Sequence, residues 1–514
     1  MARAGGSPRA AWHETRTTSA PVSVRRQKSG SRRHTAILSD VHLSQAHPDD
    51  DRDPLWMRYR RAEYHPDQDF AKLVDHLLAT RGGDEIEIVY NGDVLDFDAP
   101  WVKDGHSSFD EFPPDEAGCA EHVRRIIADH PVWFGAAARL VAAGHRLLIM
   151  SGNHDVELCW PGVRAVIRAE LARLAPQGGP PLDACDLEER VRFRAWFHVT
   201  EDGIYIEHGS QYDIFSGVRY PMLPLTRERA RIHPQMGKLA FKRTGSRMGY
   251  FNPYYEETFY LGFGGYIRHW WDHYARSRRH IVRTWFWGSV RTAIEIWRHR
   301  HDEDWVAENH ALARAETGAT DEAIHRTFAL AATPAERTML PILRELWLDR
   351  LAILILFIAL TATAGVAFGV LGAGLVVIAA IAAVAVYELL VPKPDLRSYD
   401  TAPASVKELF AIHGVRAVCM GHTHRPFGRW EGDETPCFRG NSGAWCPAFR
   451  DQGCTEPVLP RRPLLLLTSE GDALHGGLFW WDGRTLAPDA EGTESPPARR
   501  ESKARSDGAT SDAM

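Results

Sequence analysis

The sequence predicts an α/β protein that carries a membrane-embedded segment. Short apolar runs alternate with amphipathic helical patterns, which is typical of β-sheets with helices packed on them. Clusters of His, Asp and Asn directly follow several of the apolar runs. Residues 351–387, 37 positions in all, contain no charged side chain, although about 18 such residues already indicate a membrane span.

The overall composition excludes several classes of protein. With 44% hydrophobic and 25% charged residues among 514, the chain is an ordinary globular sequence. Its net charge of -6 excludes a globally basic nucleic-acid coat protein. The seven cysteines form no C-x-x-C pair, which argues against a disulfide framework and favours a reducing compartment. Residues 1–33 are basic and lack the apolar core of a signal peptide.

Strands and helices alternate in the first 210 residues. The predicted strands are 36–38, 86–90 and 147–150, and the predicted helices are 70–78 and 131–143. Segments 191–199 and 204–207, separated by Glu201-Asp202-Gly203, predict a β-hairpin.

The same pattern returns after residue 400. It predicts a helix over 405–412 and strands over 415–419, 464–467 and 477–481. Residues 226–345 differ, because they are helical in pattern and rich in Arg, Trp and Tyr. We interpret them as a helical insertion that leads into the uncharged segment.

Five polar clusters carry the candidate chemistry. They are Asp40-Val41-His42, Asn91-Gly92-Asp93, Gly152-Asn153-His154-Asp155, His208-Gly209 and Gly421-His422-Thr423-His424. Each follows a predicted strand, and α/β folds place ligands at strand ends. Carboxylate, imidazole and amide donors suit Mn²⁺, Fe or Zn²⁺, whereas the absence of thiolates disfavours a structural zinc site. Any one cluster could be a turn or a helix cap, but their joint occurrence predicts a site.

In this order the clusters resemble the signature of the calcineurin-like metallophosphoesterases: D-x-H, G-D-x-x-D, G-N-H-[D/E], H and G-H-x-H. The resemblance covers residues 35–215 and 400–485. It implies a four-layer sandwich of two mixed β-sheets flanked by helices, with a two-metal site on the loops at one end.

The resemblance also implies a role for each matching residue. One divalent cation would be held by Asp40, His42, Asp93 and His424. The other would be held by Asp93, Asn153, His208 and His422, with Asp93 bridging the two. The expected cations are two Mn²⁺, with Fe or Zn²⁺ as alternatives.

Catalysis would then use two further residues. A metal-activated hydroxide would attack phosphorus, and His154, which is not a ligand, would stabilise charge or protonate the leaving oxygen. Asp96 would pair with that histidine.

Departures from the motifs narrow the resemblance. Asp96 is followed by Phe97-Asp98 instead of Arg-Gly, which disfavours a protein Ser/Thr phosphatase. The sequence looks more like the branch of this family that contains UDP-2,3-diacylglucosamine diphosphatase, and three segments carry that likeness: 91–97, 208–213 and 441–445. That enzyme commonly has Arg where this chain has His154 and Asp where it has Ser210, so only the reaction class is carried over.

The uncharged segment is predicted to be a two-helix hairpin. The candidate ligands lie on both sides of it in sequence and must meet in one site, so both its ends lie on one side of the membrane. One helix would be about 55 Å long, whereas the bilayer core is about 30 Å thick. Gly372-Ala373-Gly374 could supply the turn. A buried hairpin in a soluble protein, or one that dips into a single leaflet, is the alternative.

Charges near the segment predict its orientation. The predicted turn has no positive side chain. Positive side chains flank both ends of the segment: Arg337, Arg344, Arg350, Lys393, Arg397 and Lys407. By the positive-inside rule, the catalytic domain faces the cytoplasm and the protein is located in the cytoplasmic or inner membrane.

The Arg- and Trp-rich stretch 266–301 has two readings. One set of residues recurs at helical spacing and predicts an apolar stripe that suits an anionic membrane interface: Val282, Phe286, Ser289, Ala293 and Trp297. A helix packed on the catalytic domain with a solvated Arg face is the alternative. Single-stranded nucleic acid is disfavoured, because the neighbouring hairpin explains the same composition.

The predicted organisation has six segments. They are a disordered basic tail (1–33), the first part of a metallophosphoesterase domain (34–225), a helical insertion (226–349), a transmembrane hairpin (350–390), the second part of the domain (391–485) and a disordered tail (486–514). The predicted function is a membrane-anchored phosphoesterase acting on a lipid or a lipid-linked nucleotide. A phosphodiesterase of a soluble substrate, anchored by the hairpin, and a non-catalytic scaffold are the alternatives. The expected partners are the phosphorylated substrate and membrane lipid; no protein partner can be inferred.

Overall fold

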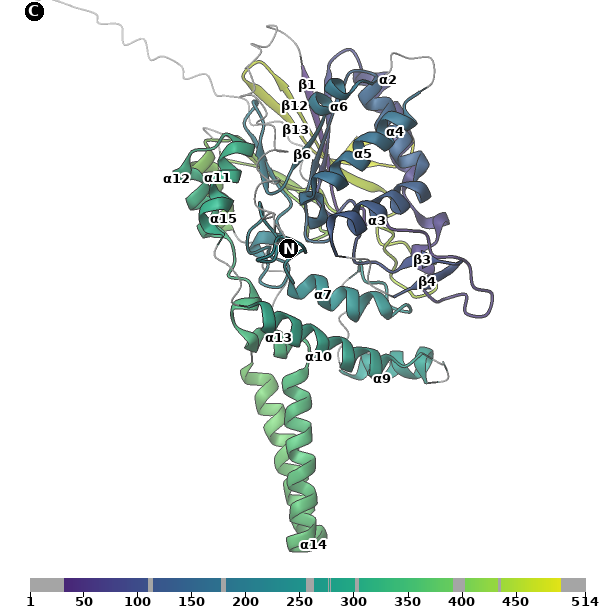
Figure 1. Cartoon of the computed structure of the whole chain (residues 1–514), viewed down its shortest axis with the longest axis vertical. Helices are drawn as coiled ribbons and strands as arrows, with labels where there is room; N and C mark the ends of the chain where they lie inside the picture. The colour runs from purple at the N-terminus through teal and green to yellow at the C-terminus, as the bar shows by residue number, and fades with distance from the viewer. Residues whose placement is uncertain are drawn as a thin grey trace, which may run out of the picture.

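Two β-sheets form the centre of the protein. The computed structural model describes residues 32–109, 114–176, 182–255, 263–275, 277, 279–300, 305–391, 403–432 and 436–490. Figure 1 shows a body built on the sheets and a long helical projection that leaves it at one end. The tails predicted to be disordered lie mostly outside the described residues, at 1–31 and 491–514.

The larger sheet has seven strands in the order β14-β13-β12-β1-β2-β5-β6. Its parallel strands are β1 (Arg33–Leu38), β2 (Glu85–Asn91), β5 (Arg146–Met150) and β6 (Val191–Arg194). The antiparallel part comprises β12 (Arg462–Glu470), β13 (Ala473–Trp481) and β14 (Leu486–Pro488).

The smaller sheet has five strands in the order β10-β11-β9-β8-β7. Its parallel strands are β8 (Ile204–Glu207), β9 (Ala417–Met420) and β11 (Cys437–Asn441), and its antiparallel edges are β7 (Phe197–Val199) and β10 (Phe427–Glu431). A separate two-stranded hairpin joins β3 (Trp101–Lys103) and β4 (His106–Ser108).

Helices cover the outer face of each sheet and complete four layers. The larger sheet packs on α2 (Asp67–Arg81), α3 (Glu116–Asp129), α4 (Pro131–Ala142), α5 (Pro161–Leu174) and α6 (Ala184–Arg190). The smaller sheet packs on α11 (Val306–Thr317), α12 (Asp321–Leu330) and α15 (Pro403–His413). Apolar side chains from both sheets, such as Ile37, Leu148 and Cys419, fill the space between them. The predicted mixed α/β architecture is therefore confirmed.

Three local predictions are wrong in part, although the predicted hairpin itself forms between β7 and β8. Segment 191–199 was expected to be one strand of a hairpin, but it divides into β6 and β7, which belong to different sheets. The chain crosses between sheets at Ala195 and Trp196, both buried, and apolar alternation cannot reveal which sheet a strand joins.

Arg33 was assigned to the basic tail, yet it begins β1, because Glu85 and Asp202 neutralise its buried guanidinium at 3.2 and 3.0 Å. Strand β14 likewise lies within the range predicted as the second tail.

Within the predicted insertion (226–349), α11 and α12 pack on the smaller sheet, and the remaining helices form a layer beneath the body. It contains α7 (Met236–Arg243), α9 (Phe263–His269), a π-helical turn (Trp270–Tyr274), α10 (Ile281–His299) and α13 (Met339–Glu345). Helix α10 packs on α7 and on α13. In Figure 1, α7 lies against the body, and α9, α10 and α13 lie beyond it.

The uncharged segment is α14 (Leu348–Leu390), which forms the projection. Within the described part of the chain it is the one helix long and apolar enough to cross a membrane, judged by length and composition. Its backbone leaves the helical region at Gly369, where φ is 65° and ψ is -162°. The break was expected at 372–374, but those residues stay helical. The two ends of α14 meet, since Arg350 Nε lies 2.6 Å from Glu388 Oε1.

We expect Trp133→Ala to be strongly destabilising. Trp133 is fully buried and stacks on Phe70 with ring centroids 3.9 Å apart, so truncation leaves a large cavity. Unfolding in detergent, followed by circular dichroism, should give a loss of about 3–5 kcal/mol. The matched control is Trp297→Ala, because Trp297 is 54% exposed; it should change stability by about 0.5 kcal/mol or less. Equal losses for both variants would contradict the assigned core.

Candidate metal centre

All five polar clusters lie at the carboxyl ends of parallel strands. The loops after β1, β2 and β5 come from the larger sheet, and those after β8 and β9 come from the smaller one. The structure brings every predicted site residue into one region where the two sheets meet: Asp40, His42, Asp93, Asp96, Asn153, His154, His208, His422 and His424.

The first group of donors is Asp40, His42 and His424, whose ligand atoms lie within 4.8 Å of one another. His424 Nδ1 donates to the Tyr254 carbonyl at 3.3 Å, so the Nε2 lone pair faces Asp40 Oδ1, 3.2 Å away. Neither buried ring nitrogen of His42 has a hydrogen-bond partner within the described part of the chain. Burial lowers the pKa of His42 to about 4, so its ring is neutral and offers a lone pair. These donors fit a cation.

The second group is Asp93, His208 and His422, with Asn153 beside them. His208 Nδ1 donates to the Asn91 carbonyl at 2.9 Å. Its Nε2 therefore faces Asp93 Oδ2 and Asn153 Oδ1, each 3.2 Å away. Three electron-rich atoms face one another here, and a proton or a metal ion between them removes the repulsion.

Asp93 is the most constrained residue of the region. Its Oδ1 accepts the His154 backbone N–H at 2.7 Å, while Oδ2 faces His208. Burial raises the pKa of Asp93, but the positive charges of His208 and His154 outweigh burial and hold the pKa well below its ordinary value. The structure places Asp93 in the second group; its bridging role stays a prediction.

Backbone strain is concentrated in the same loops. Ten non-glycine residues of the described chain have positive φ, and five of them are predicted ligands: Asp40, His42, Asp93, His422 and His424. Such conformations cost about 1–3 kcal/mol each and persist where the surroundings enforce them. Asp155 supplies part of that enforcement, because its carboxylate accepts the backbone N–H groups of Gly152, Val94 and Leu95.

The surroundings of His154 differ in detail from the prediction. Asp96 was expected to pair with it, and Asp96 Oδ1 lies 3.6 Å from His154 Nδ1. Asp98 Oδ2 is nearer, at 3.1 Å. Asp96 instead accepts the backbone N–H groups of Asp98 and Ala99. Burial lowers the pKa of His154, but the charges of Asp93, Asp96 and Asp98 prevail and raise the pKa well above its ordinary value.

Sequence reasoning missed two residues that the insertion contributes. Lys238 of α7 places Nζ 2.9 Å from Asp98 Oδ1 and 3.0 Å from Glu157 Oε1. The Tyr254 hydroxyl donates to Asp96 Oδ2 at 3.1 Å. Asp98 could have been found, since it lies on the same loop as Asp96. Lys238 lies 140 positions from Asp98 and 81 from Glu157, and Tyr254 lies 158 positions from Asp96, so neither residue leaves a local signal.

A cavity of about 2880 Å³ opens from this region. At one end it is lined by His154 and by five of the candidate ligands: His42, Asp93, Asn153, His422 and His424. It continues past apolar side chains of α7 and α10, such as Phe241 and Trp285, to the base of α14 at Leu354 and Val384. The candidate metal centre and the apolar projection therefore share one cavity.

No protein-family model matches the chain, and no curated protein matches it either. The chemistry assigned to the site accordingly depends on its own residues and their geometry.

Gly152→Ala tests whether Asp93 must occupy its observed position. A Cβ at residue 152 would lie 2.2 Å from Asp93 Oδ1, so the carboxylate must move. We expect bound Mn²⁺, measured by elemental analysis after dialysis, to fall while circular dichroism stays native. Gly135→Ala is the matched control, because nothing lies within 4 Å of a Cβ there. Unchanged Mn²⁺ in a folded Gly152→Ala protein would exclude Asp93 as a required ligand.

Proposed function

We propose that the protein is a membrane-anchored phosphoesterase with a dinuclear metal centre, which hydrolyses a phosphoester or diphosphate bond. The observation that carries the proposal is the pair of donor groups beside His154 at one end of a cavity. Two divalent cations bound there would supply Lewis-acid activation of the phosphoryl group and of a water molecule. Oxygen and nitrogen donors favour Mn²⁺, with Fe or Zn²⁺ as alternatives.

The chain's own residues would perform the remaining tasks. Asp40, His42 and His424 would hold one cation, and Asp93, Asn153, His208 and His422 would hold the other, with Asp93 bridging. His154 would stabilise charge on the phosphoryl oxygens or protonate the leaving oxygen. Its Nδ1 faces Asp98 and Asp96, which would keep the ring charged and leave Nε2 to donate.

We further infer that α14 is a two-helix transmembrane hairpin. Gly369 divides it into arms of about 20 residues, or about 30 Å, which matches a bilayer core. The Arg350–Glu388 pair and the Tyr387–Asp349 hydrogen bond join the two ends. Apolar side chains point outward, including Val366 and Val370 near the tip, each 91% exposed. Arg344 and Arg350 at the base favour a cytoplasmic catalytic domain.

The shared cavity favours an amphiphilic substrate. A phosphorylated head group would reach the donor groups, while an apolar chain would lie along Phe241, Trp285 and Leu354 toward the membrane. A lipid phosphate or a lipid-linked nucleotide has this chemistry. An enzyme with a soluble substrate would need no apolar path from the site to the hairpin.

Two substitutions separate metal binding from catalysis. Asp93→Asn should lose both Mn²⁺ and hydrolysis of bis-p-nitrophenyl phosphate, because its carboxylate faces the ring of His208 and would bridge both cations. His154→Ala should keep Mn²⁺ and lower kcat by about 10²–10⁴-fold, the usual contribution of a general acid.

Asp472→Asn and His325→Ala serve as matched controls, because both residues are exposed and lie outside the cavity lining. They should retain metal and full turnover. Metal loss in His154→Ala would make that histidine a ligand, and normal turnover in Asp93→Asn would exclude the proposed centre.

Replacing residues 351–387 by a short Gly/Ser linker tests the hairpin. Because the ends meet at Arg350 and Glu388, the linker need only join neighbouring positions. The variant should leave the membrane fraction, keep Mn²⁺ and the soluble diesterase activity, and lose activity on a phospholipid substrate in vesicles. A control with permuted arm residues keeps the hydropathy and should remain in the membrane. Hydrolysis of the soluble diester without activity on lipid, in the unaltered protein as well, would instead favour a soluble-substrate enzyme for which the hairpin is only an anchor.

A further inference from the structure

We infer that the outward face of α9, the π-helical turn and α10 is a second membrane contact, which lies on the interface of an anionic bilayer beside the hairpin. We call this surface the α9–α10 platform. The inference rests on the proposed membrane hairpin but not on the proposed chemistry of the metal centre.

The orientation of α10 is fixed by its inner face. Ser289, Thr292 and Ile296 are buried against the rest of the insertion. Gly288 lies so close to α7 that a Cβ there would be 2.7 Å from the Arg243 carbonyl oxygen, and Arg243 pairs with Glu295. The opposite face of α10 must therefore point away from the body.

The apolar stripe predicted from the sequence lies on one face of α10, but only its middle is covered. Val282 and Trp297 are exposed, at 64% and 54%, whereas Ser289 and Ala293 are buried. Small and hydroxyl side chains form the inner face because α7 approaches closely. The outer face instead presents Trp287 and Ile294, large apolar side chains that a surface facing only water would not favour.

Large apolar side chains recur over the whole platform. Trp271 in the π-helical turn is 66% exposed, Trp287 of α10 is 51% exposed and Ile294 is 44% exposed. Tryptophan is enriched at membrane–water interfaces, because its ring is apolar and its N–H is polar. The platform thus has the composition of a helix that lies in the plane of the interface.

Arginines alternate with these side chains. Arg283, Arg291 and Arg298 are exposed on α10, and no ion pair to them occurs between described residues. They share a face with Trp287 and Ile294, because the spacing along the helix is three or four residues. The acidic Glu295 is already paired with Arg243. Unpaired positive charge beside tryptophan selects the anionic lipid surface over a neutral one.

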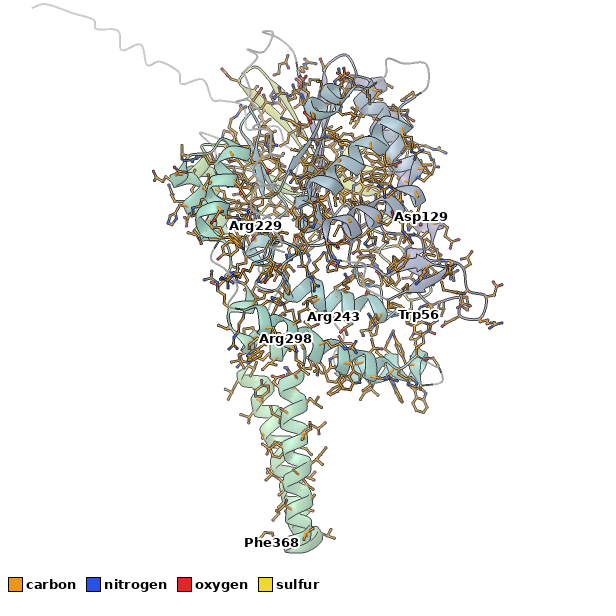
Figure 2. The ribbon with its side chains drawn as sticks, in the orientation of Figure 1. Trp56, Asp129, Arg229, Arg243, Arg298 and Phe368 are labelled. Atoms are coloured by element: carbon orange, nitrogen blue, oxygen red, sulfur yellow. The ribbon has the colours of Figure 1, made fainter. Side chains whose placement is uncertain are left out.

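The position of the platform agrees with contact to an anionic bilayer. Figure 2 shows Arg298 close to the level at which the projection leaves the body, with Phe368 at the far tip. Trp285 of α10 donates to the Leu346 carbonyl, two residues before α14 begins. A bilayer that contains the hairpin would therefore reach the platform, which is continuous with the base of α14 in Figure 1.

The test measures contact between lipid and labelled side chains of the full-length protein. In a Cys185→Ser background, which removes the exposed cysteine, Trp287→Cys is labelled with an environment-sensitive fluorophore. The protein is reconstituted into phosphatidylglycerol/phosphatidylcholine vesicles that contain a spin-labelled quencher lipid. We expect emission from position 287 to be quenched. Phe368→Cys at the hairpin tip is the positive control, and Ala79→Cys, exposed on α2 at the other end of the body, is the negative control.

The charge requirement is tested in the same labelled protein. Replacing Arg283, Arg291 and Arg298 by Gln should abolish the difference in quenching between vesicles with and without phosphatidylglycerol. A matched variant replaces Lys72, Arg326 and Arg429, which are exposed elsewhere, by Gln and should keep that difference. Quenching that is equal in neutral and anionic vesicles for the unsubstituted platform would overturn the selection of anionic lipid.

The remaining outcomes separate the inferences from one another. Quenching at 368 without quenching at 287 overturns the platform and leaves the hairpin, and would point to a protein or to solvent as the occupant. Absence of quenching at both positions overturns both. Hydrolysis of bis-p-nitrophenyl phosphate by the same samples reports the metal centre independently, because the platform residues carry no proposed catalytic role.

Discussion

The position of one buried carboxylate governs the architecture around the site. Asp93 follows β2 with a positive φ and is held by the backbone N–H of His154 from the next loop. Gly152 leaves room for it, and a side chain at Gly92 would strike the His208 ring at 2.5 Å. Loops from both sheets can therefore close around Asp93 only because these two positions lack a Cβ. The glycines at positions 92 and 152 are explained by this close approach.

More of the candidate site than of the fold could be predicted from the sequence, for a physical reason. Residues at the ends of parallel strands must meet at one edge of a sheet, so short polar clusters after apolar runs contain eight of the nine candidate residues. Asp96 lies outside these clusters and was indicated only by the resemblance to the metallophosphoesterase motifs. The division of β6 and β7 between sheets could not be foreseen, because alternation records burial and not the neighbouring strand. The sequence predicted the break at 372–374 and not at Gly369, because several glycines near the middle of α14 could each allow a turn. Only the contacts between the two ends select one of them.

The insertion point of the helical layer follows from sheet topology. Strands β8 and β9 are parallel neighbours, and the chain between them must return to the start of β9 by a crossover. Helix α15 forms the last part of that crossover, on the outer face of the smaller sheet. The insertion leaves the sheet at His208, on the site side, before the crossover begins. Extra helices added there lie over the candidate metal centre and do not disturb the strand order.

One short helix joins the candidate metal centre to the outer helical layer. Helix α7 directs Lys238 toward Asp98, which faces His154, and it directs Arg243 toward Glu295 of α10. Both ion pairs are largely removed from water on the α7 side, so each constrains the helix more strongly than an exposed pair would. The same helix also lines the cavity, so α7 contacts both the candidate metal centre and the outer helical layer.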